Sequence, residues 1–228
     1  MPTAIASACP TVIDWDKIDT VCLDMDGTLL DLAFDNWFWQ QHLPVVYAQQ
    51  QGLSLADASH RLMARIDAHI GTLNWYSLSF WSGETGIDIP ALKQSVRERI
   101  SLRPNALRFL AALKDSGRRV LMTTNADPDA LALKLAQTGI APWFDALVSS
   151  HDYGAPKEQL AFWHELQAQH PFEPARTLLL DDSLPVLTCA RDYGLAHLCC
   201  IRQPDSTLPP RAHTDPFVYV DDLAEALP

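Results

Sequence analysis

The amino-acid sequence predicts an α/β fold, a doubly wound parallel sheet with an all-helical domain inserted after its first strand. Short apolar runs recur along the chain, and each ends in polar residues. Between the later runs lie segments with helical spacing and clear helix ends, and such alternation of strands and helices is typical of a parallel sheet. Nearly a hundred residues separate the first run from the second, far more than one crossover helix needs.

Six apolar runs are expected to form the strands, at residues 21–25, 120–124, 147–149, 178–181, 198–201 and 218–220. The apolar residues in these runs are consecutive instead of alternating with polar ones. A strand covered by helices on both faces requires that pattern, because neither face meets water. A loop at 203–210 precedes the last strand, which we expect at an edge of the sheet.

The helices between the later strands are marked by their ends. Asp127 is a good N-cap, Pro128 suits the first helical position, and Gly139 is typical of the residue that follows a helix. The same signals predict helices over 105–116, which Gly117 follows, and from Ser183 to Gly194.

The segment between the first two strands is predicted to be helical throughout. Ser54 begins a stretch with apolar residues at 55, 58, 62, 66 and 70, and another helix is expected over 90–100. We therefore expect a core domain formed by residues 1–30 and 104–228, and a helical cap formed by residues 31–103.

The charge balance excludes several classes of function. The chain has 228 residues, with 17 Lys and Arg against 28 Asp and Glu, and a formal net charge of −11. Such a chain lacks the positive surface that nucleic acids and anionic membranes require, so neither is an expected partner. Because the overall field repels anions, a phosphate would need a local cation to be bound.

Two further features predict a cytoplasmic protein. The sequence has no apolar run long enough to span a bilayer, and its start lacks the basic flank of a signal peptide. Five cysteines, among them Cys9 and Cys22, show no CxxC spacing, which favours reduced thiols over a disulfide framework or a zinc site.

Two acids close the first predicted strand, in the sequence Asp24-Met25-Asp26-Gly27-Thr28. Their spacing predicts that both carboxylates project to the same side of the strand end. Two carboxylates so close resist ionising together unless a cation binds with them. A divalent cation such as Mg²⁺ would hold one ionised as ligand and nucleophile, while the other acts as acid and base. The plainer alternative is a strand that runs into an Asp-Gly turn.

The run from 24 to 28 resembles the first motif of the haloacid dehalogenase superfamily. Three further motifs of that superfamily are matched in order, over nearly the whole chain, by Thr124-Asn125, Lys157 and Asp181-Asp182. The inserted helices are similar to the small helical cap of this superfamily, whose core is Rossmann-like. Taken singly, Thr124 could be a strand-end residue, Lys157 a solvated lysine and Asp182 a helix cap.

The resemblance implies an enzyme that hydrolyses a small phosphomonoester through an aspartyl-phosphate. Asp24 would attack phosphorus, while Asp26 would protonate the leaving oxygen and later deprotonate the hydrolytic water. Thr124 and Lys157 would bind the phosphoryl oxygens. The implied ligands of Mg²⁺ are the Asp24 carboxylate, the backbone carbonyl of Asp26 and Asp182, with Asp181 assisting directly or through water.

The cap contributes candidate substrate contacts. Segments 31–39 and 72–76 are similar to those of bacterial purine 5′-nucleotidases that act on GMP and IMP within this superfamily. Aromatic rings suit a planar base and asparagines suit its edge, although most aromatics at helical spacing pack inside a cap. The candidates are Phe34, Asn36, Trp37, Asn74 and Trp75, with Asn125 on the core. In that group a histidine follows the Thr-Asn-Ala of the second motif, where this chain has Asp127.

Three functions stay open from the sequence. The leading one is a Mg²⁺-dependent phosphatase of purine nucleoside 5′-monophosphates. The second is a sugar-phosphate phosphatase or a phosphoglucomutase-like enzyme, and the third is a non-catalytic binding protein with the same fold. The intact motif set counts against the third, and the sequence does not determine the oligomeric state.

Overall fold

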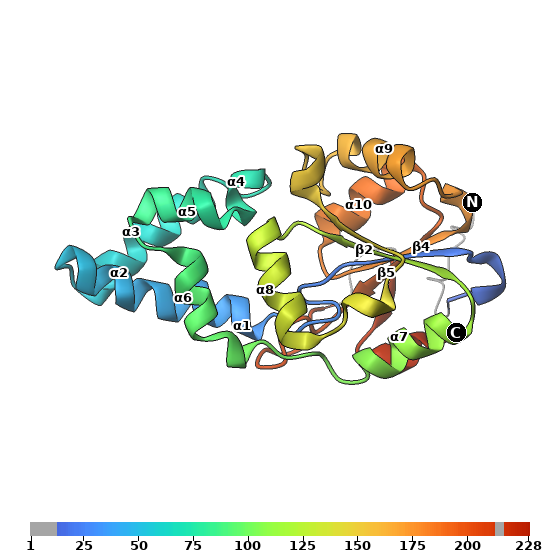
Figure 1. The fold of residues 1–228 in the computed structure, drawn as a ribbon, viewed down its shortest axis with the longest axis horizontal. Helices are drawn as coiled ribbons and strands as arrows, with labels where there is room; N and C mark the ends of the chain where they lie inside the picture. Colours follow the sequence, from blue (N-terminus) through green and yellow to red (C-terminus); the bar gives the residue numbers. More distant parts are fainter. Residues whose placement is uncertain (1–12, 213–216) are drawn as a thin grey trace, which may run out of the picture.

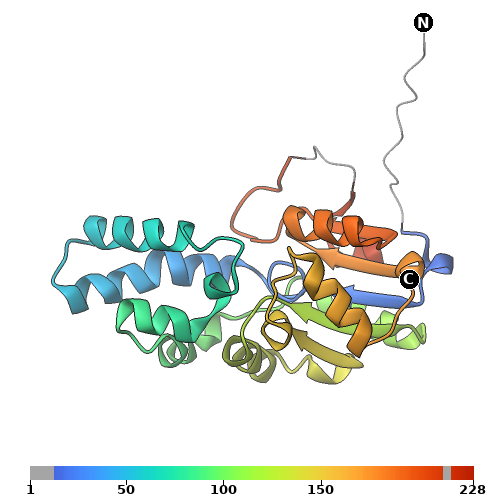
Figure 2. The same cartoon turned by 90° about the horizontal axis from the view of Figure 1, so that it is seen from above.

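The computed structural model describes residues 13–212 and 217–228, which form a layered α/β core and a group of helices beside it (Figure 1). Seen from above, the helical part lies beyond one end of the sheet (Figure 2). Cys9 and most of the segment considered as a signal peptide lie outside the described residues. Within those residues, no helix is long and apolar enough to cross a membrane.

The core sheet has six parallel strands in the order β3-β2-β1-β4-β5-β6. They are β1 (Thr20–Leu23), β2 (Arg119–Thr124), β3 (Ala146–Ser149), β4 (Thr177–Asp181), β5 (His197–Ile201) and β6 (Val218–Val220). Each predicted run overlaps one of these strands, and β6 lies at an edge as expected. β1 is central, because it pairs in register with β2 on one side and β4 on the other.

The core contains the helices α7 (Ala106–Asp115), α8 (Pro128–Thr138), α9 (Leu160–Gln169) and α10 (Leu184–Tyr193). Helices α7, α8 and α10 lie where the sequence predicts them, whereas α9 was not predicted. Alternate residues of β1 enter two different hydrophobic layers. Val21 and Leu23 share a cluster with α7 and α8, whereas Cys22 shares one with α9 and α10. All three side chains are fully buried, which is why the strand is apolar on both faces.

The helices between β1 and β2 are α1 (Ala33–Trp37), α2 (Leu43–Gln51), α3 (Leu55–Asp67), α4 (Leu73–Tyr76), α5 (Leu78–Thr85) and α6 (Ile89–Ser95). α1 continues into α2 through a π-helical turn, Phe38–His42, just before Pro44, whose missing N–H suits an irregular turn. The helix expected over 90–100 is divided into α6 and a 3₁₀ turn, Arg97–Arg99.

α3 begins after Ser54, as predicted, but buries less of its apolar stripe than expected. Ser54 accepts a hydrogen bond from the backbone N–H of Asp57, so it is a true N-cap. Ala58 and Leu62 are fully buried, whereas Leu55 is 53% and Ile70 61% exposed. Ile70 lies beyond the last residue of the helix, so it no longer follows the buried face.

Two adjacent chain segments connect the helical part to the core. Leu30 and Leu102 form an isolated antiparallel bridge, and the N–H of Arg103 donates to the carbonyl oxygen of Leu29. These residues flank the limits predicted for the cap, 31–103, and that division into domains stays a prediction.

Candidate active site

The candidate site residues of the core gather at the carboxyl ends of three neighbouring strands. Asp24 follows β1, Thr124 ends β2, and Asp181 ends β4. From β1 the chain builds the sheet outward through β2 and β3 on one side, and it then crosses from β3 back to β4 on the other side of β1, so the switch point of the sheet lies between β1 and β4. The crevice outside such a switch point is where open α/β sheets bind ligands.

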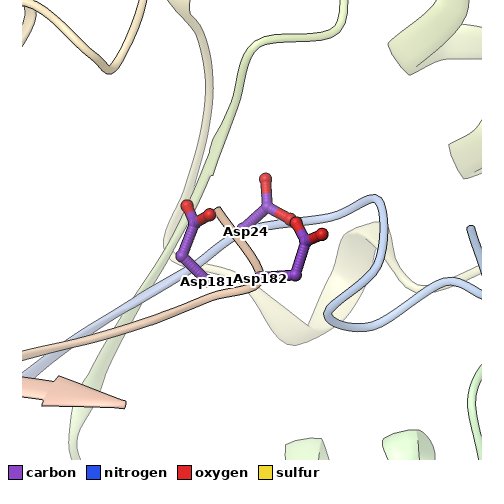
Figure 3. Close-up of side chains that lie close together, drawn as sticks. All are labelled: Asp24, Asp181 and Asp182. Atoms are coloured by element: carbon purple, nitrogen blue, oxygen red, sulfur yellow. The ribbon is translucent and has the colours of Figure 1, made fainter. Parts of the chain in front are cut away.

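Three carboxylates come together at these strand ends (Figure 3). Asp24, Asp181 and Asp182 each have one oxygen atom within 4.8 Å of the other two. Asp24 and Asp181 are buried, and Asp182 is half-buried. Such crowding of acidic groups away from water is unfavourable unless positive charge lies beside them.

Burial raises the pKa of all three carboxyls, because the charged form loses its hydration. The pKa of Asp24 rises to about 7, although the nearby Lys157 opposes the shift. Burial and the charge of Asp24 raise the pKa of Asp182 to about 7 as well. Burial also raises the pKa of Asp181 to about 6, again against the effect of Lys157.

Lys157 is a cation that the acidic chain supplies at this point. Its Nζ donates to Asp24 Oδ1 at 2.6 Å, to Asp181 Oδ2 at 2.7 Å and to the carbonyl oxygen of Thr123 at 3.0 Å. The ammonium has three donors, and all three are used. Because the side chain is only 2% exposed, these bonds hold the charge at one place.

The remaining donor atoms fit a hard divalent cation. Asp24 Oδ2 is buried and has no hydrogen-bond partner within the described part of the chain. An unpaired buried carboxylate oxygen is costly, and carboxylate oxygens are the ligands that Mg²⁺ prefers. Asp181 already accepts from Lys157 and from the N–H of Ser183. Arg211 Nη2 donates to Asp182 Oδ2 at 3.3 Å. Asp24 and Asp182 thus each keep one oxygen without a partner among the described residues, with Asp181 beside them.

Asp26 lies apart from this group, which differs from the prediction that both acids of the first motif face one side. Its Oδ1 is 2.7 Å from Nζ of Lys134 on α8. β1 ends at Leu23, so the two-residue alternation of a strand no longer applies at this turn. Gly27 has a φ of 89°, and a Cβ there would lie 2.7 Å from the carboxyl carbon of Asp182. Only glycine permits this close approach.

The residues of the second motif stabilise the loop after β2 through hydrogen bonds. Thr124 Oγ1 accepts from the N–H of Ala126 at 3.0 Å. Asn125 accepts from the N–H of Lys157 at 2.9 Å and donates to Glu158 Oε2, also at 2.9 Å. Both side chains are buried. Asn125 thus joins the loop after β2 to the segment that carries Lys157.

The first group of candidate cap residues packs within the cap or against a core loop. Phe34 is buried in the hydrophobic cluster that includes α7 and α8. The ring of Trp37 stacks on His42, with centroids 4.7 Å apart, and Arg99 lies 4.0 Å from its centroid. Asn36 donates to Asp205 Oδ2 at 2.6 Å, in the loop after β5.

The second group of candidate cap residues lies nearer the core site. Asn74 is exposed, and Trp75 meets the ring of Tyr76 edge-on at 4.8 Å. The hydroxyl of Tyr76 donates to Glu158 Oε1 at 2.6 Å. Because Glu158 follows Lys157 directly in the chain, this bond holds the segment 72–76 beside the loop that carries Lys157, a candidate phosphate-binding residue.

Sequence reasoning missed several residues that join the two parts of the molecule. Asp127 caps α8, as predicted, but its second oxygen also accepts from the N–H of Leu78 on α5 at 2.5 Å. Tyr76 and Glu158 form the contact just described. Lys134 lies in no recognisable motif, so the sequence does not identify it. Glu158 could have been identified from its position beside Lys157.

Comparison with known proteins finds similarity over most of the chain. A family model for haloacid dehalogenase-like hydrolases matches residues 18–194. The chain is 41% identical over 194 residues to the GMP/IMP nucleotidase YrfG of Escherichia coli K12. The matched region covers 85% of this chain and 87% of that protein.

Solved structures show the same fold. A HAD phosphatase from Thermococcus onnurineus superposes with a TM-score of 0.75 at 22% identity, covering 91% of this chain and 95% of the other. The HAD-hydrolase YfnB from Bacillus subtilis, solved bound to magnesium, superposes with a TM-score of 0.61 at 18% identity, covering 91% and 96%.

Proposed function

The chain belongs to the haloacid dehalogenase-like hydrolase family, and we propose that it hydrolyses purine nucleoside 5′-monophosphates with Mg²⁺ as its cofactor. The observation that carries the proposal is the buried group in which Lys157 holds one oxygen of Asp24 while the other oxygen is unpaired. The relative named for GMP and IMP supports the nucleotide part of the proposal.

Asp24 is the nucleophile in this proposal. The bond from Lys157 fixes the carboxylate, so that one of its oxygens would attack phosphorus while the other would be a ligand of the metal. Attack forms an aspartyl-phosphate and breaks the bond from phosphorus to the leaving oxygen. Water then attacks phosphorus, the bond from phosphorus to the Asp24 oxygen breaks, and Asp24 is restored as a carboxylate.

Asp26 is the acid and base. It gives a proton to the leaving oxygen in the first step and takes one from the attacking water in the second. Its side chain binds Lys134 and not Lys157, so it is separate from the carboxylates that would hold the metal. Burial raises the pKa of Asp26 although Lys134 opposes the shift, and a raised pKa favours an acid that carries its proton.

Lys157 and Thr124 would offset the charge of the phosphoryl group. When bound by Asp24, Asp182 and Asp181, Mg²⁺ would neutralise charge on these carboxylates and on the phosphoryl oxygens. Lys157 supplies the local cation that a chain with a net charge of −11 needs in order to attract a phosphate. Phosphoryl transfer depends mainly on such positioning and electrostatic stabilisation.

The test is a substrate panel on the purified protein. GMP, IMP, other nucleoside 5′-monophosphates, ribose 5-phosphate, glucose phosphates and 4-nitrophenyl phosphate are compared with Mg²⁺ and with EDTA. We expect the highest kcat/KM for GMP and IMP, loss of activity in EDTA, and recovery on adding Mg²⁺.

The other outcomes separate the alternatives. A higher kcat/KM for sugar phosphates would contradict the nucleotide assignment and leave the phosphatase assignment standing. Turnover that requires an added sugar bisphosphate would indicate a mutase. No metal-dependent hydrolysis of any ester would overturn the proposed function.

A further inference from the structure

Two lysines outside the sequence motifs are almost completely buried where the cap meets the core. Lys93 on α6 and Lys134 on α8 are each 2% exposed. The two helices lie side by side (Figure 1). Burying an ammonium is costly unless it is paired, and the mechanism above gives neither lysine a task.

The lysines and two aspartates form a continuous row of ion pairs, Asp26–Lys134–Asp35–Lys93, called here the bridging chain. Nζ of Lys134 is 2.7 Å from Asp26 Oδ1 and 2.7 Å from Asp35 Oδ2. Nζ of Lys93 is 2.5 Å from the other oxygen of Asp35. When Asp26 is ionised the formal charges cancel, and the row is then neutral as a whole. It runs from the loop after β1, through a core helix, to two cap helices.

The cap end of the bridging chain is held firmly. Lys93 lies 5.2, 4.9 and 5.3 Å from the ring centroids of Phe34, Phe38 and Trp39, which are cation–π distances. Burial works against the charge of Asp35, but the two lysines outweigh it and hold the pKa of this carboxyl well below its usual range. Asp35 is therefore a fixed anion at the base of the cap.

The core end of the bridging chain is the acid–base residue of the proposed function. Lys134 is a cation in contact with the side chain of Asp26, and it is shared equally with Asp35. The ammonium cannot follow a rotation of Asp26 without leaving Asp35. Since Asp35 is fixed in the cap, the position of Asp26 depends on how the cap packs against α8.

We propose that Lys134 is a positioning residue for the reaction, which, anchored by Asp35 of the docked cap, holds the carboxyl group of Asp26 where it transfers protons. This inference rests on the proposed function, because that function gives Asp26 its role. Lys134 itself acts only through Asp26.

The test compares two leaving groups in the variant Lys134→Met, which keeps the length of the side chain and removes its charge. The alkoxide of ribose 5-phosphate needs a proton to leave, whereas the phenolate of 4-nitrophenyl phosphate does not. Misplacing a catalytic group can cost about 100-fold. We expect kcat for ribose 5-phosphate to fall about 10- to 100-fold, and the first-turnover burst of 4-nitrophenol, followed by rapid quench, to fall less than about threefold.

A second measurement asks whether Lys134 acts through Asp26. In an Asp26→Asn background, adding Lys134→Met is expected to lower the remaining ribose 5-phosphate activity by less than about twofold, because the group it positions is already lost. Losses that multiply would overturn the inference. Equal losses for the two leaving groups would also overturn it, since they would indicate a general effect on folding or binding.

Lys93→Met is the matched control, because it removes an equally buried lysine of the same chain that does not contact Asp26. It is expected to change both leaving groups alike. Asp35→Asn is expected to reproduce the leaving-group difference of Lys134→Met with a smaller loss, about 3- to 10-fold. The same difference in Lys93→Met would contradict a specific role for Lys134.

Two further arms keep the outcomes distinct. If Lys134→Met does not fold, as judged by circular dichroism, Lys134→Met with Asp35→Asn removes one charge of each sign and is compared in the same way. Wild-type protein that hydrolyses neither ester with Mg²⁺ overturns the proposed function, and this inference with it. Wild-type turnover without a leaving-group difference in the variants overturns this inference alone.

Discussion

Two buried lysines in this molecule each hold two carboxylates, but they draw them from different places. Lys157 binds Asp24 and Asp181, which stand at the ends of neighbouring strands in one sheet. Lys134 binds Asp26, in a loop, and Asp35, on a cap helix. The first group is fixed by strand pairing, whereas the second exists only while cap and core are packed together. Nucleophilic attack is thus assigned to the part set by the sheet, and proton transfer to the part set by docking.

The largest effect is expected in the group held by Lys157. Asp24→Asn removes the nucleophile and a metal ligand while keeping a side-chain oxygen that can accept from Lys157. We expect steady-state hydrolysis to fall by roughly 10⁴-fold or more, as when a nucleophile is removed from other enzymes. Circular dichroism and binding of inorganic phosphate should be retained. Metal-dependent activity above a trace would refute the role of Asp24.

Asp26→Asn tests the group held by Lys134 and should fail differently. Attack by Asp24 survives, but water activation is lost, so turnover is expected to fall by about 10²- to 10⁴-fold. With 4-nitrophenyl phosphate the aspartyl-phosphate should form and persist, and intact-protein mass spectrometry after rapid quench should detect the added phosphoryl group. Undiminished steady-state turnover would show that the two groups do not divide the chemistry in this way.

Trp75→Leu tests whether the cap recognises a base. Stacking on an aromatic side chain is worth about 1–3 kcal/mol, so we expect GMP hydrolysis to fall by about 5- to 150-fold while 4-nitrophenyl phosphate is spared. Trp37→Leu is the comparison variant, because Trp37 stacks on His42 and Arg99 within the cap. A parallel loss for both substrates would make Trp75 a packing residue. A selective loss in Trp37→Leu would assign the base to the other group of cap residues.

The smallest effect concerns pH and the carboxylates around Lys157. Asp24 and Asp182 have pKa values of about 7, and protons compete with a metal for them. The affinity for Mg²⁺, measured by titration calorimetry, should therefore fall by about tenfold between pH 8 and pH 6. Asp24→Asn should show a weaker dependence, and an affinity independent of pH would contradict the raised pKa values.

The stability of the metal-free protein should change in the opposite direction over the same range. The folded chain holds protons on these carboxyls that the unfolded chain, with an ordinary pKa of 3.8, releases. Because the folded state binds more protons, the free energy of unfolding should rise as the pH falls from 8 to 6. Thermal unfolding in EDTA measures it.

The two groups also differ in how far the sequence could predict them. Asp24, Asp181 and Asp182 end apolar runs, and parallel strands bring such ends together, so their convergence follows from topology. Lys134 sits among apolar residues and an amide on α8, where nothing local distinguishes a buried lysine from a solvated one. Its partner Asp35 is 99 residues away in the sequence. No periodic sequence pattern predicts how two helical surfaces will pack against each other, so this ion pair could not be foreseen.

The cap residues show the same limit. The sequence indicates which segments approach the site, and 72–76 does so through Tyr76. It does not indicate which face of a short helix turns inward, because α1 and α4 span only five and four residues. Sequence spacing alone therefore could not show that Trp37 and Asn36 contact other protein residues and not a ligand.

The paired connection at Leu30 and Leu102 has a mechanical consequence. Two chain segments that run side by side between the two parts form a hinge. A domain attached in this way rotates about one axis and resists translation or twisting. Asp26 stands at that axis, since its own backbone bridges to Leu30. Any swing of the cap would sweep α2 and α3 through a wide arc, because they lie at the far end (Figure 2). The backbone of Asp26 would scarcely be displaced, whereas Asp35 would move with the cap. A swing that admits a bulky ester would therefore release the carboxyl group of Asp26 from Lys134 and Asp35, and closure would restore it.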